Sequence, residues 1–512
     1  MANNLIYDVH DKPKFGNMLL FALQQLLAIL AATIAVPTII GVPTQIPAAI
    51  FGAGVGTLVY QLFTRFKSPV FLGSSFAFLN SLGVALAYGY CGIVIGSIVA
   101  GLVYVVLALV IHFVGTDWIT KLMPPVIIGP TVTLIGLSLA GAAMGDIVKA
   151  NSSVTFGSYN LIALLCGVVT FATVIFCSTQ KKYTMPRLIP FILGIAAGYV
   201  VASIFTAIGM IADIDYFKII NWQPIIDNFV NADGSFKGFA AFVNVPDFAL
   251  IEAIKELVSG NLSPEVLAAT NGNASVIDAG GVIEVIVAFL PVALVVFAEH
   301  IADHKNLSYI IGKDLITEPG LEKTLLGDGV GSIAGTLFGI CPNTTYGESV
   351  GCVAITRNAS VATITTTAIM CIVLSFISPI TSLLQTIPSC VMGGVCLTLY
   401  GFIAVSGLKM FKDLDLNENK NLFVIAAILI AGIGGLSIQI PYAFDAVTGA
   451  VAKTIQITPI ATALLLGIAT NAVLTAVENS KLGKEDSVSV EVENTAATPS
   501  TKPEAENAEN AE

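Results

Sequence analysis

The sequence predicts an all-α polytopic membrane protein with fourteen transmembrane segments, arranged as two inverted repeats of seven. Three observations lead to this fold class. The 512 residues are 55% hydrophobic and only 11% charged, whereas soluble domains carry about 25% charged residues. Apolar runs of about 20 residues, the length that crosses a bilayer as a helix, recur along the chain. Two of these runs, at equivalent places in the two halves, are interrupted by glycine and polar residues.

Seven apolar segments precede a long polar stretch, and seven follow it. The first seven lie near 17–37, 45–64, 70–86, 91–113, 124–143, 160–178 and 188–211, and the others near 282–302, 325–341, 345–357, 359–379, 385–405, 421–437 and 457–478. The first run is expected to stay in the membrane, because Lys12 and Lys14 precede a full-length span without a small-residue cleavage site.

Basic residues predict the orientation. With the N-terminus inside, all but five of the 23 lysines and arginines fall on the cytoplasmic side, which is where they are enriched in membrane proteins. The five on the other side are Lys149, Lys218, Lys237, Lys255 and Lys453. We therefore expect an even number of spans, with both termini in the cytoplasm. The eight cysteines lie in or beside apolar segments and are interpreted as core residues, neither disulfide-bonded nor metal-bound.

The third and tenth segments are poor helices. The third contains Gly73, Ser74 and Ser75 in succession, and the tenth begins with Pro342 and contains Gly347. Unwound backbone at membrane depth survives only where it is buried in protein or lines a cavity. A pair of interrupted segments in corresponding positions of two halves is the best sequence pointer to a transporter binding site.

A weak internal repeat supports the two halves. The fifth and twelfth segments both begin with proline, carry a glycine five residues on and continue apolar to a second glycine (Pro124, Gly129 and Gly136; Pro388, Gly393 and Gly401). Repeats with an odd number of spans must insert with opposite topology, which is the plan of many secondary transporters.

Glu299 lies inside the apolar run of the eighth segment. A carboxylate at the centre of a membrane helix costs about 2.5 to 3.5 kcal/mol on insertion, so it implies a buried partner, a wet cavity or a function. The alternative is an acid that snorkels to the cytoplasmic interface, since His300, Asp303 and His304 follow at once.

Two acids and a polar strand predict the chemistry of the ligand. Glu299, Glu348 and the stretch GSSFAF at 73–78 offer carboxylate acceptors, free backbone N–H groups and aromatic rings, with no basic residue among them. This set suits a small, flat, neutral molecule with ring N–H donors and carbonyl acceptors, such as a nucleobase or cyclic imide. The alternative for Glu348 is an acid that complements the dipole at the start of a helix.

Three short motifs carry a family resemblance: LGSSFAF (72–78), AEH (298–300) and PNTTYGE (342–348). They resemble the nucleobase–ascorbate transporter family (nucleobase:cation symporters), from about Pro13 to about Ala476 and most weakly over 205–280. The resemblance implies a core domain of segments 1–4 and 8–11 that moves against a gate domain of segments 5–7 and 12–14. It also implies short antiparallel strands in segments 3 and 10, with substrate held between the two domains.

The resemblance sets the expected boundaries. These are a cytoplasmic lead (1–15), core segments with the first gate segment from 124 (16–143), gate segments six and seven (144–211), an extracytoplasmic loop (212–281), core segments eight to eleven (282–382), the last gate segments (383–480) and a disordered acidic cytoplasmic tail (481–512).

Site residues follow from the same motifs. The resemblance implies that Glu299 and Glu348 bind substrate and that the backbone N–H groups of Phe76 and Gly347 donate to its carbonyl groups. Tyr346 and Ala32 are implied to line the pocket. The family signature appears as ESVGCVAITR (348–357), with Ser349, Gly351, Thr356 and Arg357 at its marked positions.

The sequence departs from the family pattern at three places. Ser349 replaces the signature asparagine, and Gln25 stands where relatives often carry histidine. Asp303 occupies the position of a second histidine, with His304 beside it. Glu299, His300, Asp303 and His304 are therefore the expected proton-coupling residues.

The expected activity is import of uracil by proton symport across a bacterial cytoplasmic membrane. Xanthine or uric acid is the alternative substrate, and an anion transporter of the related fold is a more distant one. An enzymatic role is not expected, and neither is a cofactor, a metal or nucleic acid. The implied partners are the substrate, the proton, the lipid bilayer and a second copy in a homodimer.

Overall fold

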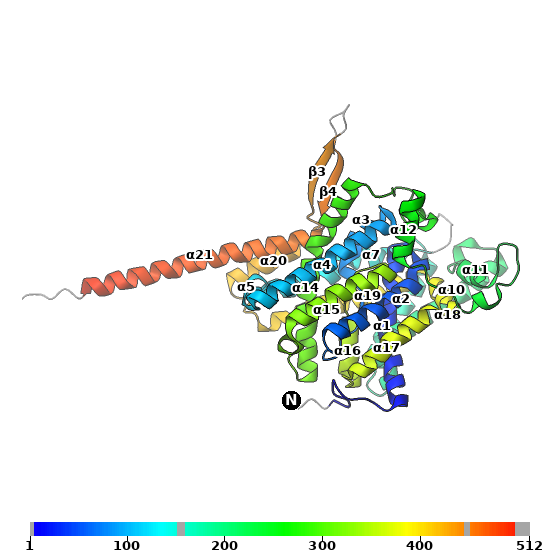
Figure 1. Cartoon of the computed structure of the whole chain (residues 1–512), viewed down its shortest axis with the longest axis horizontal. Coiled ribbons are helices and arrows are strands. Elements are labelled where there is room, and N and C mark those ends of the chain that lie inside the picture. The colour runs from blue at the N-terminus through cyan, green and yellow to red at the C-terminus, as the bar shows by residue number, and fades with distance from the viewer. Residues whose placement is uncertain (1–4, 151–158, 445–450, 497–512) are drawn as a thin grey trace, which may run out of the picture.

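The computed structural model describes residues 5–150, 159–444 and 451–496, which are mostly helical (Figure 1). The helices of the first half are α1 (Phe15–Ile39), α2 (Ile46–Phe63), α3 (Leu79–Leu86), α4 (Gly89–Val114), α5 (Asp117–Leu122), α6 (Pro125–Ser138), α7 (Ala140–Asp146), α8 (Leu161–Ser178), α9 (Thr184–Leu188) and α10 (Pro190–Ala212). Those that follow are α11 (Gln223–Phe229), α12 (Ala249–Ser259), α13 (Pro264–Ala269), α14 (Ala279–Ile311), α15 (Leu321–Phe338), α16 (Gly347–Thr356), α17 (Val361–Ser375), α18 (Ser378–Gln385), α19 (Ser389–Lys409), α20 (Asn419–Ile433) and α21 (Pro459–Ala496).

Short elements connect these helices. The strands are β1 (Leu72–Ser74), β2 (Asn343–Thr345), β3 (Ile438–Phe444) and β4 (Val451–Ile457). The 3₁₀ turns are η1 (Pro43–Gln45), η2 (Phe76–Phe78), η3 (Asp215–Phe217), η4 (Gly238–Ala241) and η6 (Met410–Asp413), and η5 (Ile316–Gly320) is a π-helical turn.

Within the described residues, nine helices are long and apolar enough to cross a membrane, and three further apolar helices are shorter. The protein is therefore a multi-pass membrane protein, as its composition predicts. Each of the fourteen predicted apolar segments contains a helix, but several of these helices are too short or too polar to count as a span by length and composition. The number of fourteen spans and the inverted repeat remain predictions.

The two interrupted segments pair with each other. Strand β1 runs antiparallel to β2, with Leu72 opposite Thr345 and Ser74 opposite Asn343. The contact continues beyond the strands, since Ser75 N–H donates to the carbonyl of Pro342 at 3.0 Å. This pairing satisfies backbone groups that a broken helix would otherwise leave unpaired in an apolar surrounding. The antiparallel strands implied by the resemblance are thus present.

The helices pack in two main groups. Helix α15 packs against α2 and α4, α2 against α17, and α14 against α4; in the other group α19 packs against α6 and α8, α8 against α10, and α20 against α21. Glycines bring α2 and α15 close, because a Cβ at Gly52 would lie 2.3 Å from the carbonyl oxygen of Gly335. Small residues that let helix backbones approach are the usual packing device in membranes.

Three features lie outside the predicted segments. The stretch 212–281 folds into α11, α12 and α13 between short turns, at the end of the molecule where α11 projects in Figure 1. Strands β3 and β4 form a hairpin between α20 and α21 that the sequence analysis does not anticipate. The prediction of disorder from residue 481 is wrong for its first part, because helix α21 continues to Ala496. No proline after Pro459 interrupts this helix. Residues 497–512 lie outside the described residues.

Candidate binding site at the broken segments

Glu299 lies within α14, which continues to Ile311. Its Oε2 atom is buried and makes no hydrogen bond with the described residues. The neighbours His300 and His304 are completely buried, and Asp303 is 6% exposed. An acid that snorkels into water would not be followed by buried polar residues, so the burial argues against that alternative. A buried acceptor without a partner is instead typical of a position that a ligand completes.

Asp303 joins α14 to the second broken segment. Thr345 Oγ1, at the end of β2, donates to Asp303 Oδ2 at 2.7 Å. Asp303 lies one turn beyond Glu299 on α14, and α16, which carries Glu348 in its first turn, contacts α14. Carboxyl groups that gather in one region cannot all be ionised at low cost. The region around Glu299 is therefore suited to bind protons or ligands that donate hydrogen bonds.

The expected donors begin two short helices that contact α14. Phe76 is the first residue of η2, and Gly347 is the first residue of α16. The N–H groups at the start of a helix have no partner within the helix. Both η2 and α16 contact α14, so the two helix starts belong to segments that pack on the helix carrying Glu299. Glu348 lies in the first turn of α16, where it also complements the helix dipole.

Tyr346 and Ala32, the two residues predicted to line the pocket, are both buried. Tyr346 is 3% exposed and its hydroxyl donates to the carbonyl of Ser74 at 3.1 Å. Its ring packs on Gly73, where a Cβ would lie 2.3 Å from the ring carbons. Ala32 is completely buried in α1. The geometry gives Tyr346 a role in holding β1 against β2.

Two departures from the family pattern contact each other. Gln25 on α1 donates through Nε2 to Ser349 Oγ on α16 at 2.5 Å, and both side chains are buried. A long amide on α1 thus reaches the short hydroxyl on α16. From the sequence, Gln25 and Ser349 are two separate departures from the family pattern. Sequence spacing does not reveal a contact between helices so far apart in the chain.

The remaining signature positions lie farther along α16. Gly351 is in the middle of the helix, and Thr356 Oγ1 donates to the Cys352 carbonyl one turn back. Arg357 is exposed and caps the helix with a left-handed φ of 56°. Its carbonyl accepts from the N–H of Ile6 at 2.8 Å. Thr356 and Arg357 therefore end the helix and bind the N-terminal segment.

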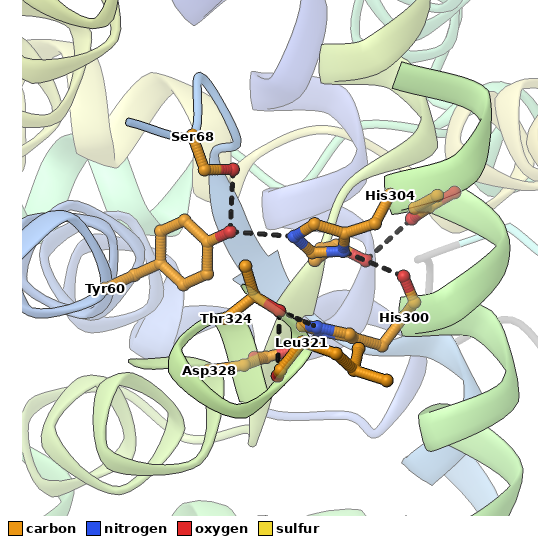
Figure 2. Close-up of polar contacts among 9 residues, drawn as sticks. Tyr60, Ser68, His300, His304, Leu321, Thr324 and Asp328 are labelled. Atoms are coloured by element: carbon orange, nitrogen blue, oxygen red, sulfur yellow. Dashed lines mark hydrogen bonds and ion pairs between the residues drawn. The ribbon is translucent and has the colours of Figure 1, made fainter. Parts of the chain in front are cut away.

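His300 forms a buried pair that the sequence analysis misses (Figure 2). Its Nδ1 lies 2.7 Å from Asp328 Oδ2, and its Nε2 lies 3.1 Å from Thr324 Oγ1. Thr324 donates its own proton to the Leu321 carbonyl, so His300 Nε2 must donate to Thr324. The remaining proton is then shared between His300 Nδ1 and Asp328. Asp328 could have been found by the same signal as Glu299, an acid within an apolar segment.

A second histidine continues the network toward α2. His304 Nδ1 lies 2.8 Å from the His300 carbonyl, and the His304 and His300 rings stack at 4.1 Å. The Tyr60 hydroxyl lies 2.8 Å from both His304 Nε2 and Ser68 Oγ, as Figure 2 shows. All four side chains are completely buried. The described residues contain no group of three His, Cys, Asp or Glu side chains placed to hold a metal ion.

Sequence comparison relates this chain to known proteins. The profile of the permease family matches residues 16–232 and 280–441. The chain is 35% identical to the uracil permease of Bacillus caldolyticus over 475 residues, covering 92% of this chain and 95% of that protein. It is 36% identical to the uracil permease of Bacillus subtilis (strain 168) over 84% of this chain and 89% of the relative. The uracil permease of Escherichia coli (strain K12) is 30% identical, over 84% and 88% of the two chains.

Solved structures show a similar fold at much lower identity. The transmembrane domain of the cyanobacterial bicarbonate transporter BicA matches with a TM-score of 0.52 and 14% identity, covering 91% of this chain and all of that one. The murine anion transporter Slc26a9 in its inward-facing state matches with a TM-score of 0.59 and 10% identity, covering 91% of this chain and 69% of its own. These similarities concern the fold alone.

Proposed function

Because the chain belongs to the nucleobase–ascorbate transporter family of permeases, we propose that it imports uracil across a bacterial cytoplasmic membrane by proton symport. The observation that carries the proposal is the buried, unpartnered Oε2 of Glu299 on α14, the helix that contacts both η2 and α16. Three relatives that match most of the chain are named uracil permeases.

Recognition follows from complementary hydrogen bonds. Glu299 accepts from one ring N–H of uracil, and Glu348 provides a second acidic group. The N–H groups of Phe76 and Gly347 donate to the ring carbonyls. A polar site that pairs each donor and acceptor of its ligand rejects analogues that lack one of them, because its own buried groups are then left unpaired.

Transport is proposed to proceed by alternating access. The core domain (segments 1–4 and 8–11) and the gate domain (segments 5–7 and 12–14) rock around the substrate in a homodimer with cytoplasmic termini. The separation of the helices into two main packing groups supports this division. The pairing of β1 with β2 supports inverted repeats whose broken segments meet at the site.

The hydrogen-bonded chain from His304 to Ser68 supports proton coupling. His304 Nδ1 must donate, since its partner is the His300 carbonyl. Tyr60 donates its hydroxyl proton to Ser68 Oγ, and its oxygen lies 2.8 Å from His304 Nε2. The Tyr60 hydroxyl therefore connects His304 to Ser68 in one hydrogen-bonded chain, along which a proton can be relayed between α14 and Ser68. Ser68 adjoins Lys67, whose side chain is 41% exposed.

Uptake of labelled uracil into proteoliposomes tests the proposal. The wild type is expected to accumulate uracil only with an inwardly directed proton gradient. Glu299→Gln should lower uptake by about tenfold or more, because a hydrogen bond to a charged group is lost. Glu284→Gln is the matched control, since Glu284 lies on the same helix and accepts from the Tyr88 hydroxyl instead.

The outcomes separate the parts of the proposal. Uracil uptake that ignores the gradient would overturn proton symport and leave the substrate intact. Uptake of labelled xanthine without any uptake of uracil would move the substrate to purines. Full activity in Glu299→Gln would overturn the site.

A further inference from the structure

A cavity of about 450 Å³, separate from the site around Glu299, lies beside the segment 212–281. It is enclosed by α11, by α18 and by the turn η1 that begins α2. None of the residues around Glu299 contributes to its lining. Its volume is in the range of sites that hold small molecules.

Helix α18 faces the cavity with a polar side. Ser378, Thr381, Ser382 and Gln385 recur at the spacing that places residues on one helix face, and all four line the cavity. The first three are only 3%, 5% and 5% exposed, whereas Ile380 and Leu383 between them are 40% and 44% exposed. A membrane protein turns polar side chains inward when they meet a cavity or a ligand.

The lining is rich in hydrogen-bond acceptors. Ser378 Oγ is buried and has no partner among the described residues. The hydroxyls of Thr381 and Ser382 donate to carbonyls of their own helix at 3.2 and 3.3 Å, which leaves their oxygen lone pairs available. The carboxyl groups of Asp227 and Asp247 also line the cavity, together with donors such as Lys237 and the Asn244 amide. A fitting ligand therefore offers both N–H donors and carbonyl acceptors.

The walls are fixed before any ligand enters. The segment at Asn244 is held to the end of α17, because Asn244 N–H donates to the Phe376 carbonyl at 3.1 Å. Ser378 N–H donates in turn to the Phe242 carbonyl at 3.1 Å. Four prolines of the lining add rigid apolar surface suited to a flat ring (Pro43, Pro47, Pro224 and Pro246). A preorganised site loses less entropy on binding.

We propose that this cavity is a second binding site for a neutral heterocycle of nucleobase size with N–H donors, the transported base itself. The inference rests on the proposed function for the identity of that base. Asp247 accepts one ring N–H, and Ser378 pairs with a ring carbonyl or N–H. The family profile does not match residues 233–279, which supply the wall around Asn244 and Asp247. The site is thus built partly from a segment outside the family profile.

Equilibrium dialysis of labelled uracil against the full-length purified protein tests this site. The wild type is expected to bind two molecules per chain, and Glu299→Gln one. In the Glu299→Gln background, Asp247→Asn or Ser378→Ala should weaken the remaining binding about tenfold, because each change removes a hydrogen-bond partner of the base. Ser382→Leu should abolish it by filling the cavity.

A matched control and two contrary outcomes complete the experiment. Ser203→Ala, which removes a helix hydroxyl bonded to the Tyr199 carbonyl outside the cavity, should leave binding unchanged. One uracil per chain, lost entirely in Glu299→Gln, would overturn the second site and leave the proposed function standing. No uracil bound by the wild type would overturn both. Melting temperatures check that each variant is folded.

Discussion

Gln25 and Ser349 show how one contact can join two departures from a family pattern. The amide of Gln25 donates to the Ser349 hydroxyl at 2.5 Å in a buried setting between α1 and α16. A polar group that loses its buried partner pays the cost of desolvation without compensation. The two residues therefore act as one unit in holding α1 against the helix that carries Glu348.

A double-mutant cycle measures the interaction energy between Gln25 and Ser349. We expect Gln25→Ala and Ser349→Ala each to lower the free energy of unfolding in detergent by about 1 to 3 kcal/mol. The double variant should cost less than the sum of the two, because each change removes the same hydrogen bond. Additive losses would contradict the pairing.

Tyr60 links His304 to Ser68 through a single hydroxyl. We expect Tyr60→Phe to retain uracil binding but to lower gradient-driven uptake about tenfold or more, because a relay without the hydroxyl cannot pass a proton. Uptake should be measured together with uracil-dependent proton entry. Tyr183→Phe, at an exposed tyrosine, is the control, and normal proton entry in Tyr60→Phe would exclude the relay.

The sequence predicts some of these residues and not others. Glu299 is detectable because a charge within an apolar run is costly, and its burial agrees with that interpretation. The partners Asp328, Thr324 and Tyr60 come from α15 and α2. Their roles depend on how helices pack, which periodicity does not contain. Asp328 lies within the predicted segment 325–341, so the cost of a charge in an apolar run identifies it as well as Glu299.

At the scale of elements, β1 and β2 depend on a glycine that no other residue can replace without movement. The Cβ of an alanine at Gly73 would lie 2.3 Å from the ring of Tyr346. The ring is held by a hydrogen bond to the Ser74 carbonyl, so it cannot move aside freely.

We expect Gly73→Ala to lower the free energy of unfolding by about 1 to 3 kcal/mol through overpacking, and to abolish uptake by displacing β2. Gly83→Ala is a control in the same segment, since a Cβ there meets no atom within 4 Å. Thermal unfolding and uracil uptake should be compared for both. An active, stable Gly73→Ala protein would contradict the packing.

The hairpin β3–β4 is an element that the sequence analysis did not predict. Ile438 pairs with Ile457, and Gln439 pairs with Gln456. This alternation of apolar and polar residues is the signal of a strand, but the flanking apolar helices hide it in a search for membrane spans. The broken segments were easier to predict, because glycine and serine inside an apolar run are conspicuous.

At the scale of the whole molecule, the segment 212–281 is anchored by two buried carboxylates outside the membrane spans. Glu256 accepts from the N–H of Tyr90 at 2.8 Å, at the start of α4. Glu265 accepts from the N–H of Thr44 at 3.1 Å, at the turn before α2. Burial raises the pKa of both carboxyl groups above the ordinary glutamate value.

The raised pKa of the two carboxyl groups determines how the stability of the folded protein changes with pH. Groups that bind protons more tightly in the folded protein stabilise it most below their ordinary pKa, and that contribution is lost as the pH rises through the raised pKa. We expect the melting temperature of the wild type, relative to Glu256→Gln/Glu265→Gln, to fall as the pH rises above the ordinary glutamate pKa of 4.5. Asp213→Asn, at a carboxylate 95% exposed, is the control. A difference that does not change with pH would contradict the effect.

The pairing of β1 with β2 also sets an order for biosynthesis. Leu72 enters the membrane with the first half of the chain, but its partner Thr345 is translated only after α14 and α15. Until then the backbone groups of β1 have no strand to bind, and the ribosome must deliver most of the protein before they are satisfied. The site therefore assembles late, and a truncated chain that ends before β2 carries an open strand edge for quality-control proteases to find.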